Sequence, residues 1–132
     1  MSIITYGNTT HLSLQASERL ANEGYDVEVL DIRSLIPLDK ESILKSVKKT
    51  GKVLIVHEDK IFGGFGGELA SIISEEAFEF LDAPVRRVGS EFTPVGFNRI
   101  LESAILPDVT KIYDASLSLL KYWMNEESCH RL

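Results

Sequence analysis

The apolar residues of this sequence change spacing several times along the chain, from short continuous runs to intervals of three or four residues. The runs are rich in β-branched residues and predict strands over 2–6, 27–32, 52–57 and 85–88. Intervals of three or four residues place apolar side chains on one face of a helix. They predict helices between the strands and after the last one, with apolar positions over 12–20, 43–47, 69–80, 98–105 and 108–123.

Strands that alternate with helices in this way are typical of a mostly parallel sheet covered on both faces, because parallel strands need long crossovers. The run Val53–Val56 is apolar without interruption, which favours a central strand buried on both sides. A fifth strand is assigned to 111–113, at the start of the last helical segment. We therefore predict an α/β fold, a single three-layer α/β/α domain with a mostly parallel five-stranded sheet. The domain spans residues 2–124 and a polar tail follows at 125–132.

Composition narrows the class of protein further. The chain has 132 residues, which suits one domain, and its net charge is −6. A negative chain is repelled by phosphate backbones and anionic membranes, so we expect neither nucleic acid nor a membrane as a partner. The first residues do not resemble a signal peptide, and the single cysteine, Cys129, permits no disulfide framework. These features favour a cytoplasmic protein, or a mitochondrial matrix protein if the source is a eukaryote.

A glycine-rich segment, Gly63-Gly64-Phe65-Gly66-Gly67, follows the third strand, at the edge where parallel sheets collect ligands. Glycines let backbone N–H groups approach an anion, and the helix that follows would add its positive end. The spacing matches neither of the common phosphate-binding glycine motifs, however, and Glu68 at the helix start would repel an anion. We favour a tight packing turn over an anion site.

The third strand ends in His57-Glu58-Asp59, which places an imidazole beside two carboxylates. Histidine is the commonest general acid or base, but alternate residues of a strand point to opposite faces, so the three side chains do not converge. His57 and Asp59 share one face, and no evident nucleophile is near them in the sequence. We favour a hydrogen-bonded strand end that positions the glycine-rich segment over a catalytic role for His57.

Charged residues also lie in and after two other strands. Asp31 and Arg33 alternate at the end of the second strand, a pattern more typical of a buried or interfacial ion pair than of catalysis. Of Arg86 and Arg87 in the fourth strand, one is expected to face solvent and the other a carboxylate or a subunit interface. The three histidines share no metal-ligand spacing and no GxSxG motif is present, so we assign no metal site and no nucleophile.

Four segments follow one another in a characteristic order, VLDIRSLIPLD at 29–39, KTGKVLIVHED at 49–59, GGFG at 63–66 and AFEFLDAPVRRV at 77–88. Together with Leu101-Glu102 and Leu106-Pro107, they resemble the C-terminal, transketolase-like domain of the beta subunit of thiamine-dependent 2-oxo acid dehydrogenases. The resemblance covers residues 2–122 and implies a pyruvate or branched-chain 2-oxo acid dehydrogenase component. The chain departs from the usual pattern at Phe92, Pro94 and Gly96, where an acidic residue and two closely spaced prolines are common.

The resemblance also implies partners and cofactors. In that family an N-terminal beta domain helps bind the thiamine cofactor and the alpha subunit holds its diphosphate. Thiamine diphosphate and Mg²⁺ are therefore expected in the intact enzyme, with none bound by this domain. The family's C-terminal domain supports assembly of the multienzyme complex, docks the subunit-binding module of the dihydrolipoyl acyltransferase and pairs about a two-fold axis, so a homodimer is expected.

No catalytic residue of the family maps onto this chain, which implies that the isolated chain is inactive. The residues singled out here would then serve an interface or position the glycine-rich segment: Asp31, Arg33, His57, Glu58, Asp59, Gly63, Gly64, Phe65, Gly66 and Arg87. Two alternatives stay open. One is a free-standing nucleotide- or anion-binding regulatory module that uses Gly63–Gly67, and the other is a catalytic remnant that uses His57.

Overall fold

A computed structural model of the chain describes residues 1–123. Within this range the strands are β1 (Ser2–Thr5), β2 (Glu28–Asp31), β3 (Val53–Lys60) and β4 (Arg86–Ser90). The helices are α1 (Thr9–Asn22), α2 (Lys40–Thr50), α3 (Phe65–Glu76), α4 (Arg99–Ile105) and α5 (Val109–Leu120), with one 3₁₀ turn at Phe78–Phe80. The tail predicted at 125–132, Cys129 and the end of the predicted domain at residue 124 lie outside the described residues.

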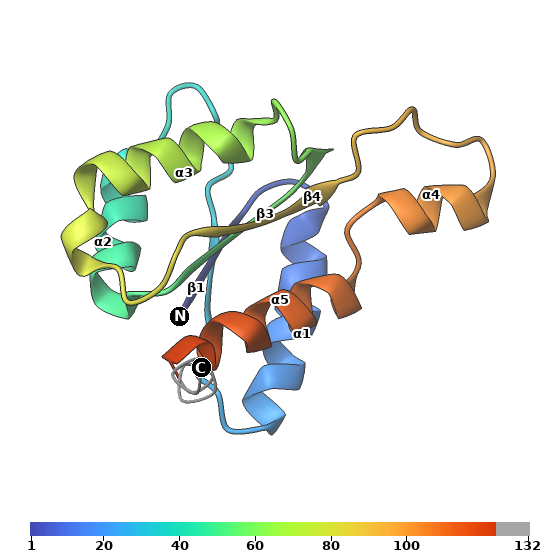
Figure 1. The fold of residues 1–132 in the computed structure, drawn as a ribbon. Coiled ribbons are helices and arrows are strands. Elements are labelled where there is room, and N and C mark those ends of the chain that lie inside the picture. The colour runs from blue at the N-terminus through green and yellow to red at the C-terminus, as the bar shows by residue number, and fades with distance from the viewer. Residues whose placement is uncertain (124–132) are drawn as a thin grey trace, which may run out of the picture.

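The strands form one parallel sheet in the order β2-β1-β3-β4, with β1 and β3 in the interior. Helices α2 and α3 cover one face, and α1 and α5 cover the other (Figure 1). The prediction of a three-layer α/β/α domain is therefore confirmed. Helix α4 belongs to neither layer and projects beyond the edge of the sheet (Figure 1).

Two apolar cores lie on opposite faces of the sheet because successive side chains of a strand alternate between faces. Ile4, Val53 and Ile55 point toward α2 and α3, and they are fully buried. Leu54 and Val56, from the same run of β3, point toward α1 and α5 and are also fully buried. This is why the run reads as continuously apolar rather than alternating.

The prediction of a fifth strand at 111–113 is wrong. In the described part of the chain the sheet has four strands, and residues 111–113 lie within α5. Asp108 caps this helix, since its carboxylate accepts a hydrogen bond of 2.8 Å from the backbone N–H of Lys111. Ile112 and Leu119 are buried and lie seven residues apart, which is a helical and not a strand repeat.

The helix ends follow ordinary capping rules. Asp39 caps α2 by accepting a hydrogen bond of 3.0 Å from the backbone N–H of Ser42. Gly51 ends the same helix with a positive φ of 70°, a conformation that glycine adopts without strain. None of the helices in residues 1–123 combines the length and the apolar character that a bilayer crossing requires.

Candidate functional site

The carboxyl ends of β1, β3 and β4 converge on one side chain, the imidazole of His57. His57 is fully buried. It lies two residues after Ile55 in β3, so it points to the same face of the sheet, toward α3. The ring of Tyr6, which follows β1, stacks on it with the two planes 4° apart and the centroids 6.2 Å apart. Phe65, at the start of α3, contacts Tyr6 edge-on at 6.3 Å. One side of the imidazole is thus covered by the ring of Tyr6, which Phe65 contacts in turn.

Three glycines enclose the rest of the imidazole. A Cβ atom at Gly66 would overlap Nε2 and Cδ2 of His57, and a Cβ atom at Gly64 or Gly89 would lie 3.0 Å from Cε1. These glycines come from the first turn of α3, the residue before that helix, and β4. The ring therefore occupies the space that side chains at these three positions would fill.

The ring is buried without a hydrogen-bond partner. Neither Nδ1 nor Nε2 has one among the described residues. Burial lowers the pKa of His57 below its ordinary value of about 6.5, because a charged imidazole would lose its hydration there. The Asp59 carboxylate opposes this shift, and the Arg87 guanidinium adds to it. His57 is accordingly neutral at pH 7.

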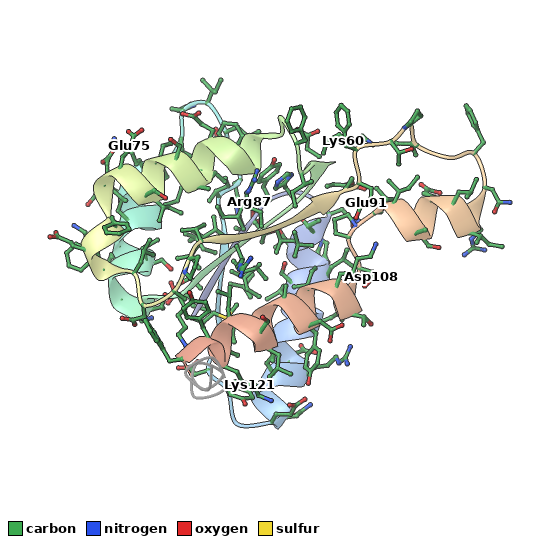
Figure 2. All side chains as sticks on the ribbon, in the orientation of Figure 1. Lys60, Glu75, Arg87, Glu91, Asp108 and Lys121 are labelled. Atoms are coloured by element: carbon green, nitrogen blue, oxygen red, sulfur yellow. The ribbon has the colours of Figure 1, made fainter. Side chains whose placement is uncertain are left out.

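Two charged residues border the enclosed imidazole. Arg87 extends from β4 and donates a hydrogen bond of 2.9 Å to the carbonyl of Ile61, in the loop between β3 and α3 (Figure 2). It faces a backbone carbonyl, therefore, and not the carboxylate considered from the sequence. Asp59 lies on the same face of β3 as His57, where its Oδ2 atom would be 3.1 Å from a Cβ atom at Gly64. The Arg87 side chain thus helps to hold the loop against the sheet.

The other candidates lie away from this cluster. Arg33 is paired with Asp31 at 3.7 Å, but the side chains are 87% and 33% exposed, so the pair is not buried in this chain. Asp31 also accepts a hydrogen bond of 3.1 Å from the backbone N–H of Arg33. Glu58 is exposed, and the hydroxyl of Ser90 donates a hydrogen bond to its backbone carbonyl. The predicted site residues therefore do not form one constellation.

Helix α3 begins earlier than the sequence indicated. Gly63 and Gly64 precede it, whereas Phe65 and Gly66 lie in its first turn. Gly63 is exposed with a φ of +78°, and Gly64 is the extended residue before the helix. The early start brings the first turn down onto His57, which only a glycine at position 66 permits. The segment is thus a strand-to-helix turn packed on a side chain.

Sequence reasoning missed two members of the cluster, Tyr6 and Gly89. Gly89 lies inside β4, and a glycine within a strand often marks the close approach of another group. Tyr6 gave no comparable signal, since it follows a strand whose neighbours in the sheet were not known. Its position depends on β1 pairing with β3, which places Thr5 opposite Val56.

The imidazole at the centre of the cluster is closed off from solvent within this chain. The only buried titratable side chain in it is sealed by Tyr6 and the glycines, so a substrate has no access to its ring. Among residues 1–123, no three His, Cys, Asp or Glu side chains are grouped so that they could hold a metal ion. The described residues therefore do not fit thiamine diphosphate with its Mg²⁺, which needs oxygen ligands for the metal.

Comparison with known protein families decides the classification. The family model described as "Transketolase, C-terminal domain" matches residues 1–112. The chain belongs to this family. A solved structure described as "Split gene transketolase, inactive beta4 tetramer" is similar to this chain in fold. That structure aligns with a TM-score of 0.77 and 29% identity, over 91% of this chain and 38% of the other.

Curated relatives of this transketolase C-terminal domain include beta subunits of dehydrogenases. The beta subunit of the pyruvate dehydrogenase E1 component of Rickettsia felis is 38% identical over 92% of this chain and 37% of that protein. The 2-oxoisovalerate dehydrogenase subunit beta of Bacillus subtilis is 38% identical over 92% of this chain and 38% of its own length. The chain thus spans little more than a third of the relatives that it matches.

Proposed function

We propose that this chain is the assembly and partner-docking domain of the beta subunit of a 2-oxo acid dehydrogenase complex. The observation that carries the proposal is the match of nine-tenths of the chain to about a third of such beta subunits. The intact enzyme would decarboxylate pyruvate or a branched-chain 2-oxo acid oxidatively, with thiamine diphosphate and Mg²⁺ held by the alpha subunit and an N-terminal beta domain. This domain would contribute surfaces to the complex and no catalytic group.

The geometry of the buried imidazole supports a non-catalytic role. A general acid or base must come within hydrogen-bonding reach of a substrate, and His57 is enclosed on the sides described above. The catalytic-remnant alternative therefore lacks support. The anion-binding alternative also lacks support, because Gly64 and Gly66 are buried against the ring and Glu68 places a negative charge in the first turn of α3.

The acidic end of α3 is a surface on which a basic docking module could bind. Glu75, Glu76 and Glu79 are exposed there and border a shallow hollow with Phe78 (Figure 2 labels Glu75). Lys40 pairs with Glu76 at 2.7 Å, so the neighbouring carboxylates supply most of the negative charge. An apolar residue inside a ring of charges suits a small basic partner, with the charges steering its approach.

Calorimetric titration with the subunit-binding module of a dihydrolipoyl acyltransferase tests the docking role. We expect binding that weakens as salt is raised from about 0.05 M to 0.5 M, since screening shortens the reach of charges. Glu79→Lys should weaken binding by about fivefold, which corresponds to roughly 1 kcal/mol for a rim charge. Glu18→Lys makes the same charge change on α1, which covers the opposite face, and serves as the matched control.

If the docking proposal is correct, the two variants differ in their affinity for the module. Equal loss of affinity in Glu79→Lys and Glu18→Lys would show that only the total charge matters. It would rule out the acidic end of α3 as the docking site. Absence of binding by the unmodified chain at low salt would contradict the docking role altogether.

A further inference from the structure

A hollow lies beside the start of β4, between the C-terminal ends of α3 and α5 (Figure 1). Its volume is about 330 Å³, at the lower end of the range for sites that hold a small molecule. Three aromatic side chains line it, one from the 3₁₀ turn after α3 and two from the residues after α5: Phe78, Tyr122 and Trp123. A small molecule in the hollow would therefore meet aromatic rings from both helical layers.

These aromatic side chains are left open to solvent. Phe78 is 75% exposed and Trp123 is 56% exposed. The rings of Tyr122 and Trp123 meet edge-on, with centroids 5.3 Å apart and planes 79° apart, so their faces point in different directions. Large aromatic side chains gathered in one hollow and left exposed are typical of a binding surface rather than of core packing.

The hollow also carries negative charge. Asp82 lines it, and its carboxylate lies against Gly51, where a Cβ atom would overlap it. The backbone N–H of Asp82 donates a hydrogen bond of 2.7 Å to the carbonyl of Gly51, which fixes the position of the residue. No ion pair within residues 1–123 joins Asp82 to a cation. Phe78 also borders the acidic hollow at the end of α3, so carboxylates lie on that side as well.

Elsewhere in this chain, aromatic rings are covered by the chain's own cations. The guanidinium of Arg19 lies 4.3 Å from the centroid of the Tyr113 ring, and the ammonium of Lys48 lies 5.0 Å from that of Phe80. The face of an aromatic ring carries partial negative charge and attracts a cation, most strongly in tryptophan. The rings that line the hollow have no such partner among the described residues.

The lysines nearest in sequence to the hollow are engaged by other groups. Lys48 lies over Phe80, and the ammonium of Lys52 donates a hydrogen bond of 2.9 Å to the carbonyl of Leu120, at the end of α5. In the part of the chain that the structure describes, no lysine or arginine lines the hollow. A cation that binds there would therefore come from outside this part of the chain.

We propose that this hollow binds a small organic cation of the substituted-ammonium class. The carbon atoms around the charged nitrogen contact the rings of Phe78, Tyr122 and Trp123, and the Asp82 carboxylate balances the charge. A bare metal ion would not use the aromatic walls, and a neutral apolar molecule would not use the carboxylate. The inference goes beyond the docking role proposed above and does not depend on it.

A pair of ligands that differ only in charge tests the proposal. Choline carries a trimethylammonium group, and 3,3-dimethyl-1-butanol has the same shape with a neutral carbon atom in place of the nitrogen. Trp123 is the only tryptophan of the chain, so its fluorescence reports directly on the hollow. At constant ionic strength, choline should change this fluorescence saturably, with a dissociation constant on the order of 1 mM. The neutral analogue should bind about fivefold more weakly.

Three variants that keep Trp123 show which groups hold the cation. Asp82→Asn should weaken choline binding about fivefold and leave binding of the neutral analogue unchanged, because only the charge is lost. Phe78→Leu should weaken choline binding about threefold, since one aromatic wall is removed. Phe92→Leu is the matched control: it changes a phenylalanine that is 72% exposed and follows β4, away from the hollow, and should have no effect.

The melting temperature of each variant, measured without ligand, checks that the fold is kept. The proposal is overturned if choline gives no saturable change up to about 50 mM, fifty times the expected dissociation constant. It is also overturned if choline and the neutral analogue bind equally well, which would make the hollow a merely apolar surface. Equal effects of Phe78→Leu and Phe92→Leu on choline binding would contradict the assignment to this hollow.

Discussion

Replacement of Gly66 by alanine is expected to lower the free energy of unfolding by about 2–3 kcal/mol, a large loss for one methyl group. The added Cβ atom would overlap Nε2 and Cδ2 of His57, and the ring has no room to retreat, because it is buried beneath Tyr6 and against Gly89. Relief requires the first turn of α3 to lift from the sheet. Chemical denaturation of the purified variant measures the loss.

Gly67 provides the matched control for Gly66. It lies next in the same helical turn, but the nearest atom to a Cβ at this position is the end of the Arg87 side chain, 3.3 Å away, which can move. Gly67→Ala should therefore change stability by less than about 1 kcal/mol, and a gain is possible because alanine is the better helix former. Equal losses at the two positions would contradict the packing account.

The His57 ring itself provides a second control. In a His57→Ala background the overlap disappears, so Gly66→Ala should cost much less than it does in the original chain. A double-mutant cycle measures this coupling. If Gly66→Ala costs the same in both backgrounds, the glycine is needed for some reason other than the imidazole.

Stability should fall as the pH is lowered from 7 to 5. The folded chain holds the pKa of His57 below the ordinary value near 6.5, mainly through burial, whereas the unfolded chain titrates at that value. The unfolded state therefore binds the proton first, and the contribution is fully present above about pH 6.5 and is lost as the pH falls toward the folded-state pKa. For a single proton, the slope cannot exceed about 1.4 kcal/mol per pH unit.

The charged and titratable groups that face the ring fit this expectation. Asp59 opposes the shift in pKa and Arg87 reinforces it, while burial raises the pKa of Tyr6, so Tyr6 stays neutral throughout the range. Glu28 and Asp39 have pKa values below their ordinary values near 4, so their losses come at lower pH. These two carboxylates therefore do not contribute to the slope between pH 7 and 5.

Denaturation curves at several pH values measure the slope. His57→Leu, which keeps an apolar side chain of similar size, should flatten it, whatever the variant does to absolute stability. His11→Gln changes an exposed histidine on α1 and should leave the slope as it was. A slope that survives His57→Leu would show that another group is responsible.

Most of the fold could be predicted from the sequence because the local sequence patterns agree with the positions of the strands and helices in the folded chain. The uninterrupted run at 53–56 marked an interior strand, and the helical spacing at 43–47 marked α2. The error at 111–113 arose because a segment as short as Lys111-Ile112-Tyr113 fits a strand as well as a helix turn. Only the seven-residue interval between Ile112 and Leu119 separates the two.

The candidate site could be predicted only in part. The sequence identified His57 and the glycines after it, but not that they touch, because contact depends on α3 beginning at Phe65 rather than after Gly67. Gly89 and Tyr6 come from strands on either side of β3, and only the strand order brings them to the same ring. The helical spacing at 98–105 was predicted, but spacing does not reveal that its apolar face is left exposed.

We propose that this domain completes a thiamine-dependent dehydrogenase without supplying its catalytic groups. The most direct measurement is the rate of 2-oxo acid decarboxylation with thiamine diphosphate and Mg²⁺, for this chain alone and in mixtures. We predict no turnover by the chain alone, none by an alpha subunit with an N-terminal beta segment, and turnover when all three are combined. Turnover by this chain alone, or full activity of the other components without it, would contradict the claim.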